Sequence, residues 1–168
     1  MRVYLPATSS VLRRLRDDGV VAPAPLTAFA VTPALREWYI DDDIEELEYA
    51  ASKEAARASL RLISQDAGAA QRRVVIAADV DDAELTIRDD LDRGVVWIER
   101  ELPLAWCAAL HADDADAEEA VRVAAQQVDL ADLGDSAAED AVDDADAFEL
   151  CWYATQEMDD LLTEMSPD

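Results

Sequence analysis

The apolar run Arg73-Val74-Val75-Ile76-Ala77-Ala78 decides the fold that this 168-residue sequence favours. A short continuous run of β-branched and other apolar residues predicts a strand buried on both faces, which places it at the centre of a sheet. Further strand patterns lie at 2–5 (ending at Pro6), 27–31, 95–101 and 106–111. Together they predict a mixed sheet of about five strands with helices packed on it.

Helix signals follow several of these strands. Thr8-Ser9-Ser10 and Thr32-Pro33 are typical helix starts, because a hydroxyl caps the first turn and proline needs no donor there. The helix after Pro33 is expected to carry Leu35, Trp38 and Tyr39 toward the core. The longest helix is predicted after Asp43, which is followed by twenty residues without glycine or proline.

Two segments in the second half have weaker patterns. Residues 129–137 are polar and contain Gly134, which predicts a mobile loop. From Ala138 onward, apolar residues at steps of three or four predict one long helix or two in line. The alternation of strands and helices indicates an α+β fold (an α/β sandwich), with residues 1–168 forming a single domain.

Charge divides the chain into two halves. The sequence has 39 acidic and 14 basic residues, giving a net charge of −25. Residues 1–75 are near neutral at −1, and residues 76–168 form an acidic half at −24. Such a charge repels phosphates and anionic lipids, which argues against direct binding of nucleic acid or membranes. A basic protein partner fits the charge, and so does a solvated surface shaped by an acid-rich proteome.

One strand end suggests metal chemistry. The segment Val74-Val75-Ile76-Ala77-Ala78-Asp79-Val80-Asp81 resembles the first motif of haloacid-dehalogenase-like phosphatases, which implies a nucleophilic and an acid/base aspartate. Ala83 departs from that pattern, and no lysine follows Lys53 to neutralise a phosphoryl group. With His111, the only histidine, and Asp113, these aspartates are candidate metal ligands. The same aspartates are equally explained as strand ends and helix caps.

Two charged surfaces are candidate interaction sites. Acidic residues that neither caps nor loops fully explain mark a predicted interaction surface: Asp129, Asp132, Asp135, Asp140, Asp143, Asp144 and Asp146. Arginines of the near-neutral half form a predicted basic patch that would bind an anion or the acidic half of another copy: Arg13, Arg14, Arg57 and Arg61. If the patch binds the acidic half of another copy, the protein would form a homo-oligomer.

Several segments resemble an uncharacterised family of actinobacterial proteins of about this length: Arg2-Val3-Tyr4-Leu5-Pro6-Ala7, residues 28–39, residues 45–51 and Trp152-Tyr153-Ala154-Thr155-Gln156-Glu157. The resemblance implies a cytoplasmic actinobacterial protein. It carries no functional residue with it, because the family has no assigned activity.

The sequence holds no complete catalytic constellation, so we expect a non-catalytic cytoplasmic interaction or regulatory protein with an acidic surface. Its four isolated glycines exclude phosphate-binding and dinucleotide motifs. No cofactor is expected beyond a weakly bound divalent cation. The first alternative is a metal-dependent, phosphatase-like hydrolase using Asp79, Asp81 and His111. The second is a DNA mimic, which requires regularly spaced carboxylates along one face.

Overall fold

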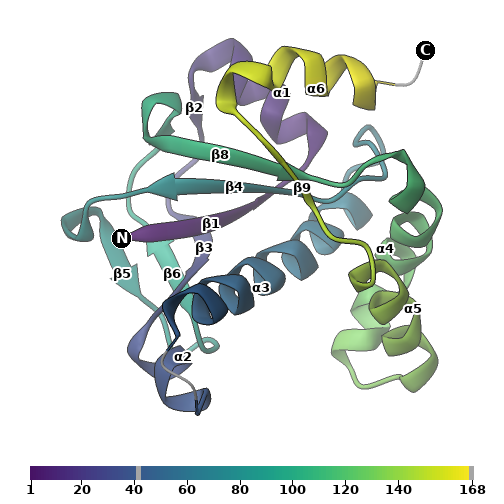
Figure 1. Cartoon of the computed structure of the whole chain (residues 1–168), viewed down its shortest axis with the longest axis horizontal. Helices are drawn as coiled ribbons and strands as arrows, with labels where there is room; N and C mark the ends of the chain where they lie inside the picture. Colours follow the sequence, from purple (N-terminus) through teal and green to yellow (C-terminus); the bar gives the residue numbers. More distant parts are fainter. Residues whose placement is uncertain (41–42, 167–168) are drawn as a thin grey trace.

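A computed structural model describes residues 1–40 and 43–166, in which a seven-stranded sheet carries helices on both faces (Figure 1). The strand order is β5-β6-β3-β1-β4-β8-β9, and β2 pairs with β7 in a separate small sheet. The strands are β1 (Arg2–Ala7), β2 (Val20–Val21), β3 (Leu26–Ala30), β4 (Val74–Asp79), β5 (Leu85–Ile87), β6 (Val95–Ile98), β7 (Leu102–Pro103), β8 (Cys107–Ala112) and β9 (Cys151–Tyr153). The α-helices are α1 (Ser9–Asp18), α2 (Pro33–Trp38), α3 (Ile44–Ser64), α4 (Glu118–Asp132), α5 (Ser136–Asp146) and α6 (Met158–Met165).

Strand β4 has the central position that its apolar run predicts. Its residues from Val74 to Ala78 are at most 1% exposed, and burying each valine or isoleucine side chain contributes about 1.5–3 kcal/mol. All of the described strand pairs are antiparallel. The α+β class is therefore confirmed, whereas the expected mixed sheet of about five strands is an antiparallel sheet of seven.

Strand β1 continues through Pro6 instead of ending there. Its register with β4 runs from Arg2 opposite Asp79 to Ala7 opposite Val74, but β3 pairs with it only at Val3 and Tyr4. A proline is tolerated in a strand where its missing N–H faces no neighbouring strand. Pro6 lies beyond the pairing with β3 and so satisfies that condition.

Different helices cover the two faces of the sheet. On one face, Leu12 of α1 and Leu161 of α6 belong to the same buried cluster as Val74 of β4. On the other, Ala51 and Ala55 of α3 pack in a cluster with residues of β1, β3, β4 and β8. The antiparallel helices α4 and α5 form a hairpin beyond the end of the sheet, packed on the C-terminal turns of α3 (Figure 1).

Most helix starts agree with the sequence. Thr8 accepts a hydrogen bond from the backbone N–H of Val11, and Thr32 accepts one from that of Leu35. Asp43 caps α3 by accepting from the N–H of Glu45. Gly19 ends α1 in the left-handed conformation at φ 76°, where the absence of a Cβ removes the steric penalty.

The second half differs more from expectation. Residues 129–137, expected to be a loop, are mostly helical, because α4 extends to Asp132 and α5 begins at Ser136. The predicted helix from Ala138 onward ends at Asp146, and β9 and α6 follow it. Strand β5 was not predicted from the sequence.

Trp38 and Tyr39 do not reach the core. Their exposed fractions are 62% and 42%, whereas Leu35 of the same helix is 4% exposed. Helix α2 has six residues, and only Leu35 among them is buried. So short a helix presents few side chains to the sheet, and Trp38 lies outside that contact. The expectation for these two aromatic side chains was therefore wrong.

Ser59 joins α3 to the two central strands. Its hydroxyl donates to the carbonyl oxygen of Ala7 at 2.7 Å and accepts from the N–H of Val74 at 3.1 Å. The side chain is fully buried. One hydroxyl thus satisfies two backbone groups at the point where β1 ends and β4 begins.

We expect Ser59→Ala to lower the free energy of unfolding by about 2–4 kcal/mol, because it leaves two buried backbone groups without a partner. Urea unfolding followed by circular dichroism measures this change. Ser64→Ala is the matched control, because Ser64 is exposed and its hydroxyl donates to the carbonyl oxygen of Arg61 in the same helix. Equal stability of the two variants would contradict the linking role of Ser59.

Candidate functional site

The two aspartates at the end of β4 have structural partners. Asp79 accepts two hydrogen bonds from the guanidinium of Arg2, at 2.7 and 3.1 Å, and this interaction lowers the pKa of Asp79. Asp81 caps the 3-10 turn at 82–84 by accepting from the N–H of Ala83 at 3.0 Å. Both carboxylates thus fit the alternative of a strand end and a cap.

His111 and Asp113 lie away from that strand end. His111 is opposite Val75 in the register of β4 with β8, and four residues of strand separate Val75 from Asp79, about 13 Å. Within residues 1–40 and 43–166, no three His, Cys, Asp or Glu side chains lie close enough to hold a metal ion. The predicted set Asp79, Asp81, His111 and Asp113 is not brought together.

Asp113 instead forms a buried ion pair with Arg73. The carboxylate accepts from Nε and Nη2 of Arg73 at 2.8 Å each, and also from the backbone N–H of Arg73 at 2.8 Å. The two side chains are 1% and 0% exposed. Arg73 also donates to Asp146 of α5 at 3.2 Å and to the carbonyl oxygen of Phe148 at 2.8 Å. The side chain of Arg73, directly before β4, is thus bonded to the residue after β8, to the last residue of α5 and to the segment that follows α5.

A second ion-pair cluster joins α3 to the α4–α5 hairpin. Asp132 accepts from Arg57 at 3.0 Å and from Arg61 at 2.7 Å, and Glu139 accepts from Arg57 at 3.0 Å. The hydrogen bond from Arg61, followed by that from Arg57, lowers the pKa of Asp132 against the opposing effect of burial. Three helices are therefore connected by four charged side chains.

The predicted basic patch is divided between two places. Arg57 and Arg61 lie on α3 and have carboxylate partners within their own chain. Arg13 and Arg14 lie on α1, which packs on the opposite face of the sheet from α3. The four arginines do not form one surface, and two of them already bind the acidic half of this chain.

The predicted acidic surface also divides. Asp132 and Asp146 face arginines, and Asp135 caps α5 by accepting from the N–H of Ala138 at 2.9 Å. Asp129 borders a depression lined by the end of α3 and by α4.

Three carboxylates of the seven share the outward side of α5: Asp140, Asp143 and Asp144. All three are exposed, and within the described part of the chain none of them has a hydrogen bond or an ion pair. We call these three residues the α5 acidic face.

Sequence reasoning missed the structural role of Arg73 and its neighbour Arg72. Arg72 is 4% exposed and pairs with Glu118 and Glu164. A signal was present, because an arginine directly before a fully apolar strand is drawn into the core with it and requires a carboxylate. The register of β4 with β8, which supplies Asp113, cannot be read from the residues alone.

The chain matches a family model over residues 1–162, and the match is described as a family of unknown function (DUF6912). This match covers nearly the whole chain, so the protein belongs to that uncharacterised family. Comparisons with curated proteins and with solved structures gave no match. No helix in residues 1–40 and 43–166 has the length and apolar character needed to cross a membrane.

We expect Asp113→Asn to lower the free energy of unfolding by about 3–5 kcal/mol, because it leaves the buried Arg73 without its charge partner. Asp114→Asn, on the adjacent exposed residue that caps the following turn, is the control and should change stability by less than about 0.5 kcal/mol. Thermal and urea unfolding measure both. An Asp113→Asn protein as stable as the wild type would show that the pair contributes no net stability.

The Asp132 cluster should make stability depend on pH. A carboxylate whose pKa is lowered on folding stabilises the protein fully at pH above its unfolded value, near 3.8, and loses that contribution as the pH falls through the lower folded value. We expect Asp132→Asn to be less stable than the wild type by about 1 kcal/mol at pH 7. The difference should shrink toward zero below pH 3.8. Urea unfolding of both proteins at pH values from 7 down to below 3.8 measures this difference in stability. A difference that does not change with pH would contradict a stabilising role for the ionised Asp132.

Proposed function

We propose that this protein is a non-catalytic interaction or regulatory protein whose α5 acidic face contacts a basic partner protein. The proposal includes a cytoplasmic location in an actinobacterium. The observation that carries it is the division of the acidic half. Most of the carboxylates that face inward have arginine partners, and the α5 acidic face is left for a partner's cations.

The α5 acidic face is unfavourable for its own helix. Asp140 and Asp144 are four residues apart, so like charges repel along one side. Asp143 and Asp144 lie near the C-terminal end of α5, where the helix dipole disfavours anions and where the last turn has no basic residue. Features that cost stability and fill no structural role in the chain are typical of binding sites.

Exposed apolar side chains lie on the same hairpin, toward the end where α5 begins. Leu130 and Leu133, near the tip of the α4–α5 hairpin, are 49% and 85% exposed. Apolar contact provides affinity, while carboxylates supply steering and orientation toward a basic surface. A basic segment with apolar side chains on one side fits this combination.

The alternatives gain less from the structure. A hydrolase needs its carboxylates and imidazole to converge, and Asp79, Asp81 and His111 lie apart. A DNA mimic needs a regular row of carboxylates, and the seven predicted residues divide between arginine partners, a helix cap and outward positions. The interaction proposal uses three neighbouring carboxylates on one helix that, within the described residues, have neither an arginine partner nor a capping role.

Replacing Asp140, Asp143 and Asp144 together by Asn should weaken binding of a deca-arginine peptide by about tenfold. A matched variant, Glu37→Gln with Glu101→Gln and Asp160→Asn, removes the same charge from exposed positions elsewhere and should change affinity by less than about threefold. Fluorescence anisotropy at 50 and 150 mM salt measures both.

The same triple variant should unfold at a higher urea concentration than the wild type, because it relieves repulsion in α5. Weaker peptide binding by a more stable protein cannot come from damage to the fold. Equal weakening in both triple variants would mean that net charge alone attracts the peptide, which would overturn the proposal.

A further inference from the structure

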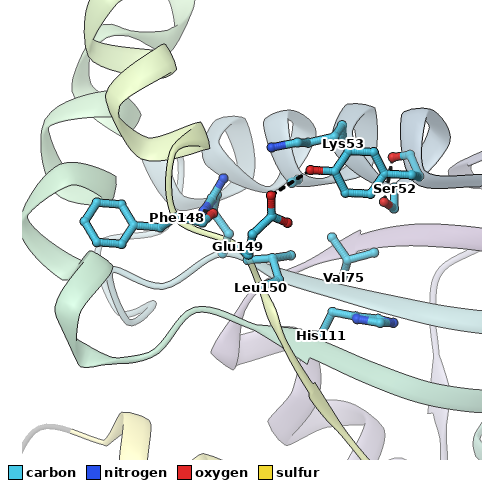
Figure 2. Close-up of a pocket in the computed structure, with 10 residues that line it drawn as sticks. Ser52, Lys53, Val75, His111, Phe148, Glu149 and Leu150 are labelled. Carbon is cyan, nitrogen blue, oxygen red and sulfur yellow. Dashed lines mark hydrogen bonds between the residues drawn. The ribbon is translucent and has the colours of Figure 1, made fainter. Parts of the chain in front are cut away.

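A cavity of about 210 Å³ lies on the α3 side of the sheet. Tyr49, Ser52 and Lys53 line it from α3, and His111 lines it from β8. The segment between α5 and β9 closes one end with Phe148, Glu149 and Leu150 (Figure 2). Helix α3 packs mainly over β1, β3 and β4, and the cavity lies beside it where His111 of β8 is half-buried.

The cavity holds the only lysine and the only histidine of the chain. The other basic side chains of this sequence are 13 arginines. Lysine differs from arginine in having a compact charge on a flexible stem with three rotatable donors, which adapts to a small ligand. Histidine is similarly set apart by a ring that both donates and accepts when neutral. Two residue types that occur once each therefore meet in one small space.

Lys53 retains unused donors. Its ammonium donates to the carbonyl oxygen of Asp146 at 3.1 Å and lies beside the phenol of Tyr49, 5.5 Å from the ring centre. Within the described residues it forms no ion pair, although the chain has 39 acidic residues. The charge of Lys53 acts on the carboxylate of Asp146, where it opposes the rise in pKa that burial causes. The hydrogen bond itself goes to a backbone oxygen, so the remaining donors of the ammonium are suited to an anion from outside the chain.

The ring of His111 is half-buried, and within the described part of the chain it makes no hydrogen bond. Burial, and to a smaller extent the charge of Arg2, lowers its pKa, so the neutral ring presents one donor and one acceptor at neutral pH. Leu150, which is partly buried, provides apolar surface beside it, and the buried Val75 and Ala56 lie behind that surface.

Glu149 occupies the mouth of the cavity. Its carboxylate accepts from the hydroxyl of Tyr49 at 2.7 Å, and the residue is exposed. Figure 2 shows Glu149 between Lys53 on one side and His111 on the other. The carboxylate thus lies where the head group of a bound anion would meet Tyr49 and Lys53.

We propose that this cavity binds a small organic carboxylate, whose head group displaces Glu149 from Tyr49 and pairs with Lys53 while its apolar body lies against Leu150 beside His111. The volume is below the roughly 300–1,000 Å³ of cavities that take drug-sized ligands. The ligand is therefore no larger than a substituted benzene ring. Arg73 lines the cavity but is already held by Asp113 and Asp146, so Lys53 supplies the charge.

Three probes of similar shape separate the contribution of ligand charge to binding from that of apolar contact: benzoate, which is anionic, benzyl alcohol, which is neutral, and benzamidine, which is cationic. The chain has one histidine, so its imidazole ¹H–¹³C signal needs no assignment and reports entry into the cavity. We expect benzoate to shift this signal saturably and to bind about tenfold more tightly than benzyl alcohol. Benzamidine should bind least.

Two substitutions should act in opposite directions. Lys53→Met should weaken benzoate binding about tenfold, and Glu149→Gln should tighten it severalfold because the internal competitor loses its charge. Lys53→Arg should stay within a few-fold of the wild type. Glu101→Gln, which removes one negative charge at an exposed position elsewhere, should leave the affinity unchanged.

The proposal is overturned by the absence of a saturable shift with benzoate, by equal affinity for the three probes, or by tighter binding of benzamidine that Glu149→Gln abolishes. Lys53 and Glu149 lie at the cavity rim, and urea unfolding of each variant checks that the fold is kept. If Lys53→Met fails to fold, the affinity of Glu149→Gln for benzoate still tests the proposal. Tighter binding than in the wild type supports it, and unchanged or weaker binding contradicts it.

Discussion

The buried pair of Arg73 and Asp113 is the interaction on which the rest of the structure depends. A guanidinium removed from water requires a carboxylate and further acceptors, because an unpaired buried charge costs several kcal/mol. Arg73 finds them in Asp113, in Asp146 and in the carbonyl oxygen of Phe148. The pair therefore fixes β4 against the end of β8 and holds the C-terminal end of α5 beside the sheet. That placement in turn forms one wall of the cavity around Lys53.

The charge division of the sequence has a structural explanation that composition alone does not reveal. The near-neutral half is neutral because its arginines balance its own acids, yet Arg57, Arg61, Arg72 and Arg73 all pair with carboxylates of the acidic half. Part of the acidity is thus the internal counter-charge of the first half. Among the seven acidic residues singled out from the sequence, the three on α5 remain exposed without an arginine partner or a capping role in the described part of the chain, and the proposed function rests on these.

Local signals were sufficient for the elements that local chemistry specifies. The run at Val74–Ala78 predicted the central strand, and Thr8, Thr32 and Gly19 marked helix ends, because caps and apolar runs act within a few residues. The sequence could not place Trp38 at the surface or show that β9 interrupts the helical pattern after Asp146, because both depend on packing against distant segments. The structural roles of Asp113 and Asp132 were missed for the same reason, because their arginine partners are 40 or more residues away.

The position of β1 has a consequence for the order of assembly. This first strand lies inside the sheet, and its longest pairing joins residues 2–7 to residues 74–79. A chain emerging from the ribosome therefore cannot form the centre of its sheet until residues 74–79 have been made. The edge strand β9 joins β8 later still, carrying the wall of the Lys53 cavity with it. Such long-range pairing places the fold among the slower ones for its size, with the α4–α5 hairpin, a local structure, free to form early.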